Sequence, residues 1–340
     1  MTDAVHVVVP GPLGQISGGY IYDRRIVAGL AASGRRVVVH ELPGSFPMAD
    51  EVARTAAAAT VPALPGAGRS VIDGLALPAF EGCMGDLPPL WIALVHHPLA
   101  LESGHPPERA RWLGELERTM LRHAARVIVT SRRTARDVAD LGVAPERIGV
   151  VEPGTERRRC APADGHPPHL LSVGALIPRK GHDLLLTALG RLQALPWRLT
   201  LVGSATREPR TAGCLRAMVE AAGMSERVEF AGEVAADRLD RLYAAADLFV
   251  LPSRHEGYGM ALQEALASGL PIVSTRAGAI SDTVPESAGL LVRADDPEAL
   301  EEALARVLTG RDLRARLRCG ARAARNGLRE WPDAVARFAE

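Results

Sequence analysis

The chain has 340 residues, of which 47% are hydrophobic, and this length and composition predict about two globular domains. Its 40 basic side chains balance 40 acidic ones, so no net charge drives a sequence-independent grip on nucleic acid or on an anionic membrane surface. Its apolar runs are far shorter than the roughly 20 residues that span a bilayer, and residues 1–10 lack the pattern of a signal peptide, so we expect a cytoplasmic protein.

Short β-branched segments alternate with longer helical patterns rich in Ala, Leu and Arg, which predicts an α/β fold with parallel sheets. The strands expected in the first half are 5–9, 36–41, 90–96, 126–130 and 148–151, and the helices are 20–33, 109–123 and 131–141. Residues 49–89 are rich in Ala, Pro and Gly, and we expect one helix and one short strand there. The strands expected in the second half, with helices between them, are 170–173, 198–202, 228–231, 248–251, 271–275 and 289–292.

Turn-forming residues, prolines and charges gather between residues 153 and 168, which is typical of an exposed connection between domains. We expect one domain over residues 1–159 and a second over 160–320. A C-terminal helix over 321–340, broken at Trp331-Pro332, is expected to cross back to the first domain. The run Arg157–Arg159 is expected to be a solvated face of the connection.

The stretch PSRHEGYGMALQEALASGLPIV, residues 252–273, follows an apolar strand and leads through a glycine loop into a helix expected to begin near Met260. A helix that starts directly after such a loop offers unpaired backbone N–H groups and the positive end of its dipole, which predicts a phosphate site. Glu256 lies in the loop and Glu264 in the helix. Carboxylates accept hydrogen bonds from adjacent hydroxyls, so a sugar and a ribose that flank a diphosphate would satisfy both.

A second strand-to-helix corner, SVGALIPRKGHD, spans residues 172–183. Arg179 and Lys180 stand where two cations can stabilise the charge that grows on a leaving diphosphate. Lys180 is the only lysine in the chain, and its compact ammonium is not interchangeable with a planar guanidinium.

These two corners resemble the motifs of the retaining nucleotide-sugar glycosyltransferases of family 4, also called glycosyl transferases group 1. The most specific element is E-x7-E, here Glu256 and Glu264 in the frame HEGYGMALQEALASGLPIV. The resemblance implies a GT-B fold, in which two Rossmann-like domains with parallel sheets face one another across a cleft. It also implies that Glu256 contacts the transferred sugar, that Glu264 binds the ribose, and that Arg179 and Lys180 meet the diphosphate.

Weaker parts of the resemblance lie elsewhere in the chain. The glycine loop at 11–19 would present Gly18 and Gly19 to the donor phosphates, and the loop at 231–234 would hold the base. Side chains alternate along a strand, so one of His96 and His97 should point into the cleft, and we favour His96. The expected catalytic residues are His96, Arg179, Lys180 and Glu256. The expected donor-binding residues are Gly18, Gly19, Gly174, Val234, Gly257, Tyr258, Gly259, Met260 and Glu264.

The reaction that the resemblance implies is retaining transfer of a hexosyl group from a UDP-, GDP- or ADP-linked sugar to a glycan, a lipid-linked acceptor or a small molecule. The alternatives are a GT-B sugar-nucleotide epimerase or hydrolase, and an NAD(P)-dependent oxidoreductase. The last is disfavoured because the loop at 11–19 lacks G-x-G-x-x-G. Residues 107–122 mix arginines with apolar side chains such as Trp112, a pattern typical either of peripheral contact with the inner face of a membrane or of an ordinary amphipathic core helix.

We expect neither a metal site nor a cofactor. No D-x-D follows a strand, and no His/Cys set has the spacing of metal ligands. The four cysteines are far apart with no CxxC pair, which predicts buried thiols in a reducing compartment. They are Cys83, Cys160, Cys214 and Cys319.

Overall fold

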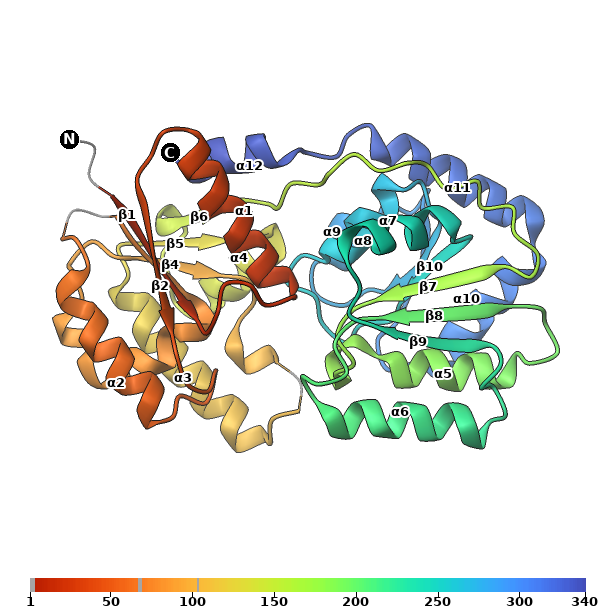
Figure 1. The fold of residues 1–340 in the computed structure, drawn as a ribbon, viewed down its shortest axis with the longest axis horizontal. Coiled ribbons are helices and arrows are strands. Elements are labelled where there is room, and N and C mark those ends of the chain that lie inside the picture. The colour runs from red at the N-terminus through yellow and green to blue at the C-terminus, as the bar shows by residue number, and fades with distance from the viewer. Residues whose placement is uncertain (1–3, 67–68, 103) are drawn as a thin grey trace. The chain divides into compact units, whose positions relative to one another are not determined.

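The structure is a computed structural model that describes residues 4–66, 69–102 and 104–340, and the chain divides into two compact units (Figure 1). Unit 1 contains the described residues up to Gly154 together with Trp331–Glu340, and unit 2 is Thr155–Glu330. The chain changes unit after Gly154 rather than after residue 159. The reason is local: the N–H of Thr155 donates to the carbonyl of Arg329 at 2.8 Å, within unit 2.

Unit 1 contains a parallel six-stranded sheet in the order β2-β1-β3-β4-β5-β6. Its strands are β1 (Val5–Pro10), β2 (Val37–Leu42), β3 (Ser70–Asp73), β4 (Ile92–Val95), β5 (Arg126–Val129) and β6 (Ile148–Val150). Its α-helices are α1 (Gly18–Ala32), α2 (Glu51–Thr60), α3 (Pro107–His123), α4 (Arg132–Asp140) and α12 (Trp331–Phe338). Shorter 3-10 segments are η1 (Val61–Ala63), η2 (Gly74–Asp86), η3 (Leu99–Leu101) and η4 (Pro145–Arg147).

Unit 2 contains a second parallel six-stranded sheet, in the order β12-β11-β10-β7-β8-β9. Its strands are β7 (His169–Val173), β8 (Arg198–Val202), β9 (Val228–Gly232), β10 (Leu248–Leu251), β11 (Ile272–Thr275) and β12 (Gly289–Val292). Its helices are η5 (Pro178–Lys180), α5 (His182–Arg191), α6 (Pro209–Ala221), α7 (Ala236–Ala245), α8 (Met260–Ala267), α9 (Ile280–Thr283), α10 (Pro297–Thr309) and α11 (Arg311–Arg325).

The expected α/β class with parallel sheets is confirmed, and each of the eleven strands predicted by range begins and ends within two residues of an observed strand. Residues 49–89 hold the expected helix and strand, α2 and β3, followed by the 3-10 segment η2. The largest shift concerns β4, predicted from residue 90 but observed from Ile92. Leu90 is 51% exposed, so this apolar side chain lies outside the buried part of the sheet.

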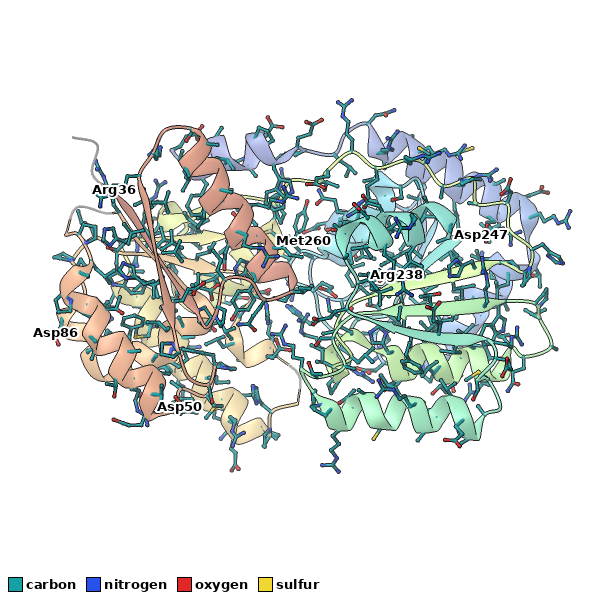
Figure 2. All side chains as sticks on the ribbon, viewed as in Figure 1. Arg36, Asp50, Asp86, Arg238, Asp247 and Met260 are labelled. Atoms are coloured by element: carbon teal, nitrogen blue, oxygen red, sulfur yellow. The ribbon has the colours of Figure 1, made fainter. Side chains whose placement is uncertain are left out.

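Several local signals account for where the elements begin and what they pack against. The side chain of Asp50, labelled in Figure 2, accepts the N–H of Ala53 at 2.9 Å and caps α2. Every residue of β10 is buried, as expected of a central strand in a parallel sheet covered on both faces. The helix α12 packs on α1 in unit 1, where a Cβ on Gly29 would meet Val335 at 2.3 Å, so the absence of a side chain at Gly29 permits this contact.

The four cysteines are free thiols, but the expectation that they are buried is wrong. Cys160, Cys214 and Cys319 are exposed and Cys83 is half-buried. For Cys214 the cause is helix periodicity: in α6 the buried positions are 212, 215 and 219, and residue 214 falls on the opposite face.

The expected split of α3 into a buried and an exposed face is present. Leu113, Leu116 and Met120 are buried in unit 1, whereas Trp112 is 37% exposed. In the part of the chain that the structure describes, no helix is both long enough and apolar enough to cross a bilayer.

The strand orders also indicate where each unit can bind a ligand. In an open parallel sheet, ligands bind beyond the carboxyl ends of the strands where the strand order reverses direction. This point lies between β1 and β3 in unit 1 and between β7 and β10 in unit 2. The loops that follow β7 and β10 are the two corners singled out in the sequence.

Candidate functional site

The two corners of unit 2 pack directly against each other. The first ends at Gly181, whose φ of +67° is left-handed, and a Cβ there would lie 2.1 Å from the carbonyl oxygen of Pro252. Any side chain at residue 181 would therefore push the corners apart. The N–H of Arg254 donates to the carbonyl of Arg179 at 2.8 Å, and Nη1 of Arg179 donates to the carbonyl of His255 at 3.0 Å.

A side chain that the sequence reasoning missed, Arg254, strengthens this contact. Its guanidinium donates to both carboxylate oxygens of Asp183, at 2.9 and 2.7 Å, and Nε donates to Asp295 at 2.7 Å. Asp183 is in the first turn of α5, so Arg254 ties the loop after β10 to the helix after β7. An arginine in a chain so rich in arginine carries no signal in the sequence that distinguishes it from a solvated one.

Glu256 and Lys180 form the centre of this arrangement. Nζ of Lys180 lies 2.6 Å from Oε1 of Glu256, and Oγ of Ser253 donates to the same oxygen at 2.6 Å. Nη1 of Arg179 lies 3.7 Å from Oε2. Glu256 is only 5% exposed, and burial would raise its pKa, but Lys180 and then Arg179 hold that pKa at about 2. Glu256 is therefore a carboxylate at neutral pH.

The helix α8 begins beside Glu256, at Met260, which Figure 2 labels. Gly259 precedes it with φ +91°, and among the described residues no side chain caps this end. The first N–H groups of α8 thus meet the requirement for an anion site predicted from the glycine loop. The loop itself is fixed from two sides, because Gln263 donates to the hydroxyl of Tyr258 at 2.7 Å and Thr283 donates to its carbonyl at 2.7 Å.

Glu264 belongs to a second group of side chains, on the body of α8. It accepts a hydrogen bond from the hydroxyl of Tyr243 at 2.9 Å, and Nη2 of Arg158 lies 3.4 Å from its other oxygen. The guanidinium of Arg158 lies 4.8 Å from the centre of the Tyr243 ring. Burial raises the pKa of Glu264, and Arg158 opposes that shift.

The prediction that Arg157–Arg159 is a solvated face holds for Arg157, which is 86% exposed, and is wrong for Arg158, which is 11% exposed. Arg158 is drawn inward by the Tyr243 ring and by the carboxylates of Asp240 and Glu264. Three consecutive arginines look alike in sequence, so only the fold separates their roles.

The remaining predicted residues of unit 2 lie around the same corners. Gly174 follows β7, and a Cβ there would meet the side chain of Lys180 at 3.2 Å, so the missing side chain leaves room for the lysine stem. Nε2 of the buried His182 lies 3.4 Å from the carbonyl of Gly174. Gly257 is buried in the loop before α8. Val234 follows β9 and packs, half-buried, against the core.

In unit 1, Gly18 and Gly19 are the first residues of α1, and His96 follows β4. A Cβ on Gly19 would lie 3.1 Å from Cδ2 of His96, so the glycine permits close approach of helix and ring. Nε2 of His96 lies 3.1 Å from Oδ1 of Asp23 and 3.2 Å from Oδ2 of Asp73. The sequence did not indicate either carboxylate. Asp23 lies in a helix without a distinguishing motif, and Asp73 lies within the Ala-, Pro- and Gly-rich residues 49–89.

His97, in contrast to His96, bonds to Glu102 through Nε2 at 3.0 Å. The two neighbours therefore have different partners, although both lie beyond the end of β4, where the alternation of a strand no longer applies.

Within the described ranges, one set of His, Cys, Asp and Glu side chains is close enough together to hold a metal ion. It consists of Asp23, Asp73 and His96, whose potential ligand atoms lie within 4.8 Å of one another. Nε2 of His96 also lies within hydrogen-bonding distance of both carboxylates, so the same three groups can share protons.

Comparison with known proteins gives the family of this chain. The model of the family "Glycosyl transferases group 1" matches residues 155–324, and that of "Glycosyltransferase Family 4" matches residues 74–159. The chain belongs to this family, which confirms the resemblance of its motifs.

Relatives of assigned activity and of known structure agree with this assignment. The D-inositol 3-phosphate glycosyltransferase of Acidothermus cellulolyticus is 35% identical over 248 residues, which cover 65% of this chain and 54% of the relative. The chain thus spans about half the length of the curated relatives it matches. The sucrose-phosphate synthase of Thermosynechococcus elongatus superposes with a TM-score of 0.83 over 99% of this chain and 97% of the other, at 21% identity.

HepE of Anabaena, solved in complex with UDP-glucose, superposes with a TM-score of 0.76 over 98% of both chains, at 18% identity. At such identities the superpositions establish the fold, and the expected GT-B fold with two parallel six-stranded sheets is confirmed.

Proposed function

We propose that this chain is a retaining glycosyltransferase that moves a hexosyl group from a nucleotide-diphosphate sugar to an acceptor hydroxyl. The observation that carries the proposal is the buried Lys180–Glu256 pair, 2.6 Å from Nζ to Oε1, beside the uncapped start of α8. The cation and the unpaired backbone N–H groups can bind the diphosphate of such a donor. The carboxylate can accept a hydrogen bond from a hydroxyl of its sugar.

The contacts of Glu256 assign a task to each of its oxygens. Oε1 already accepts hydrogen bonds from Lys180 and Ser253, so we assign Oε2 to the hydroxyls of the transferred sugar. A pKa of about 2 keeps Glu256 an acceptor throughout the neutral range. An ammonium has three N–H donors, so Lys180 can bridge Oε1 and an oxygen of the diphosphate.

In the proposed reaction the bond between the sugar C1 and the phosphate oxygen breaks while a bond from C1 to the acceptor oxygen forms on the same face of the ring. The acceptor proton passes to the departing phosphate oxygen, so atoms and charges balance. Negative charge grows on the diphosphate as the bond breaks, and Lys180, Arg179 and the first N–H groups of α8 stabilise it. The chain's own cations would do this work, so we propose that no metal ion and no cofactor is required.

We propose that Glu264 binds the ribose hydroxyls. Its pairing with Tyr243 and Arg158 orients the carboxylate, and one turn of α8 separates it from the phosphate end of the helix. Gly257, Tyr258, Gly259 and Met260 would supply backbone groups to the diphosphate, Val234 would face the base, and Gly18, Gly19 and His96 would serve the donor and acceptor from unit 1.

The donor and the acceptor are proposed by class. UDP-sugars are the first donors to test because HepE was solved with UDP-glucose, and GDP- and ADP-sugars follow. Among acceptors, D-inositol 3-phosphate is the first to test because the relative from A. cellulolyticus is named for it, followed by glycans and lipid-linked acceptors. A cytoplasmic location, with peripheral contact to the inner membrane face if the acceptor is lipid-linked, remains part of this proposal, and four free thiols support a reducing compartment.

The test has two stages. Thermal-shift measurements with UDP, GDP and ADP should show selective stabilisation by one nucleotide. The sugars linked to that nucleotide are then incubated with and without each acceptor, and products are identified by mass spectrometry and their anomeric configuration by NMR. Transfer with retention supports the proposal. Release of free sugar or of an epimer without transfer to any acceptor would instead favour the hydrolase or epimerase, and stabilisation by NADH would favour the oxidoreductase.

A further inference from the structure

The cluster of Asp23, Asp73 and His96 lies at the strand reversal of unit 1. The residues come from α1, from the end of β3 and from the segment after β4, so the sheet order brings together groups far apart in sequence. Asp23 is 1% exposed and Asp73 is 4% exposed, whereas the side chain of His96 keeps 17% exposure. The carboxylates are thus enclosed, and only the ring reaches the surface of the unit.

The hydrogen bonds of the cluster determine where its protons are. Nε2 of His96 lies within hydrogen-bonding distance of both Asp23 and Asp73, and it donates to whichever of them is ionised, because a carboxylate oxygen only accepts. Asp73 lies near enough to Asp23 to raise its pKa, because two negative charges repel each other, so one carboxyl of the pair gains by holding a proton. An imidazolium, one carboxylate and one carboxylic acid sum to zero charge, and a neutral cluster costs least to bury.

The electrostatics of the cluster agree with this count. Burial would lower the pKa of His96, but Asp23 and then Asp73 raise it to about 10. Burial raises the pKa of Asp23 to about 7, with His96 opposing the shift and Asp73 adding to it. One buried atom, Oδ2 of Asp23, has no hydrogen-bond partner among the described residues, so it is the natural position for a proton held by this carboxyl.

The ring of His96 is also held sterically. Tyr22 packs against it edge-on, with ring centres 5.4 Å apart, and the Tyr22 hydroxyl is occupied by the carbonyl of Val151. Thr130 donates to the carbonyl of His96 at 3.1 Å, and Gly19 lies against the ring. In the described part of the chain no protein group bonds to Nδ1, and unlike Oδ2 of Asp23 this atom is not among the enclosed ones.

We propose that Asp23 and Asp73 are positioning residues: they turn Nε2 of His96 inward and thereby present Nδ1–H as a fixed hydrogen-bond donor to an oxygen of the substrate. The inference rests on the proposed glycosyl transfer and deepens it. It makes His96 a donor rather than a general base, because the nitrogen that reaches substrate already carries its proton. The carboxylates act through His96 and touch no substrate themselves.

The first test needs no activity. In the full-length 15N-labelled chain, the two ring nitrogens of His96, assigned by comparison with His96→Gln, should both be protonated at about pH 7.5. The double variant Asp23→Asn/Asp73→Asn should make His96 neutral at that pH. The exposed His123 is the internal control, and its ring signals should be the same in both proteins at that pH. A neutral His96 in the unaltered chain, or one that stays protonated in the double variant, would overturn the inference.

The second test uses turnover. Asp23→Asn and Asp73→Asn should each lower kcat by about tenfold or more, while the donor KM stays within about threefold, as expected of groups that orient another. Melting shifts with the nucleoside diphosphate should not change, because the carboxylates are enclosed and act only through His96. Normal kcat in both single variants would refute the positioning role. Two single variants are used so that misfolding of one, detected by its melting temperature, leaves the other decisive.

The outcomes separate this inference from the proposed function. If the unaltered chain transfers no sugar, the proposed function fails, and the NMR titration still decides the protonation of His96. If transfer occurs but kcat is normal in the single variants, only the inference fails. Titration with Zn²⁺, Mn²⁺ or Mg²⁺ gives a further check, since stoichiometric binding that shifts or broadens the His96 signals would show a metal site instead.

Discussion

Nζ of Lys180 and Oε1 of Glu256 are 2.6 Å apart although 76 residues separate them in the chain. The strand order of unit 2 explains this proximity, because β7 and β10 are neighbours and the loops beyond them meet. Both side chains are largely buried, with 15% and 7% exposure. The pair therefore combines a structural contact with the chemistry of the site, and substitutions must be chosen to separate the two.

Lys180→Ala should reduce kcat by about 10²–10³ while affinity for the nucleoside diphosphate falls less, because the ammonium acts on charge that develops in the transition state. Lys180→Arg should not restore the rate, since a planar guanidinium is not interchangeable with the compact ammonium that lies 2.6 Å from Glu256. Steady-state kinetics and calorimetric binding measure the two quantities.

A matched control guards against a purely structural effect of the Lys180 substitutions. Removing one partner of a buried ion pair costs about 3–5 kcal/mol, so melting temperatures should be compared as well. Lys180→Ala/Glu256→Gln removes the uncompensated carboxylate and should recover stability without recovering kcat. Recovery of both would mean that the pair only supports the fold.

Arg254→Ala should weaken nucleoside diphosphate binding by about tenfold, because the two corners lose their bidentate link through Asp183. Arg254→Lys should not restore it, since lysine cannot bond to both carboxylate oxygens in this way. The control is Arg191→Ala, which removes contacts to Glu298 and Glu301 on the surface and should leave binding unchanged. Equal affinities for all three variants would contradict the role assigned to Arg254.

Tyr243→Phe should selectively impair recognition of the ribose, because Glu264 loses the hydroxyl that orients it at 2.9 Å. The measurement compares UDP, or whichever diphosphate binds, with its 2′,3′-dideoxy analogue. We expect the preference for the natural ribose to shrink in Tyr243→Phe and to vanish in Glu264→Gln. A preference unchanged in both variants would show that Glu264 does not bind the ribose.

The sequence predicted the class of fold well and singled out the two corners that the fold brings together in unit 2, for physical reasons. The buried strands of a parallel sheet appear in the sequence as short apolar runs such as Leu248–Leu251. The glycine loop before Met260 predicts where the next helix begins. It did not predict Asp23 or Arg254, because a buried aspartate in a helix and one arginine among many have no local pattern. Their partners lie on other segments, so only the sheet order reveals them.

His182 should make the fold sensitive to mild acid. Burial lowers the pKa of His182 to about 4, so its contribution to stability is complete above pH 6.5 and is lost as the pH falls through 4. Between pH 7 and pH 5 the free energy of unfolding should therefore lose roughly 2 kcal/mol that His182→Gln does not lose. Glu256 does not interfere, because its lowered pKa keeps its contribution intact above pH 4.5.

Denaturant unfolding at the two pH values measures the effect of His182. Asp23 and His96 have raised pKa values and shift stability in the opposite direction, but they are present in both proteins, so the difference isolates His182. The exposed His123→Gln variant is the control and should follow the unaltered chain. If His182→Gln shows the same pH dependence as the unaltered chain, His182 is not buried as a neutral ring.

Gly278→Ala tests how the backbone holds Glu256 in place. Gly278 has φ +61°, and a Cβ there would lie 2.2 Å from the carbonyl oxygen of Glu256. The same oxygen accepts a hydrogen bond from the N–H of Ala279 at 2.8 Å. Gly223 has nearly the same φ, +65°, but open space around the added carbon. Gly223→Ala should therefore cost only the left-handed backbone strain, about 1–2 kcal/mol, and leave kcat unchanged. Gly278→Ala carries the same strain and must also displace Glu256, so it should lower both stability and kcat further. Equal kcat for the two variants would mean that the position of Glu256 tolerates movement of its loop, which the buried contacts with Lys180 and Ser253 argue against.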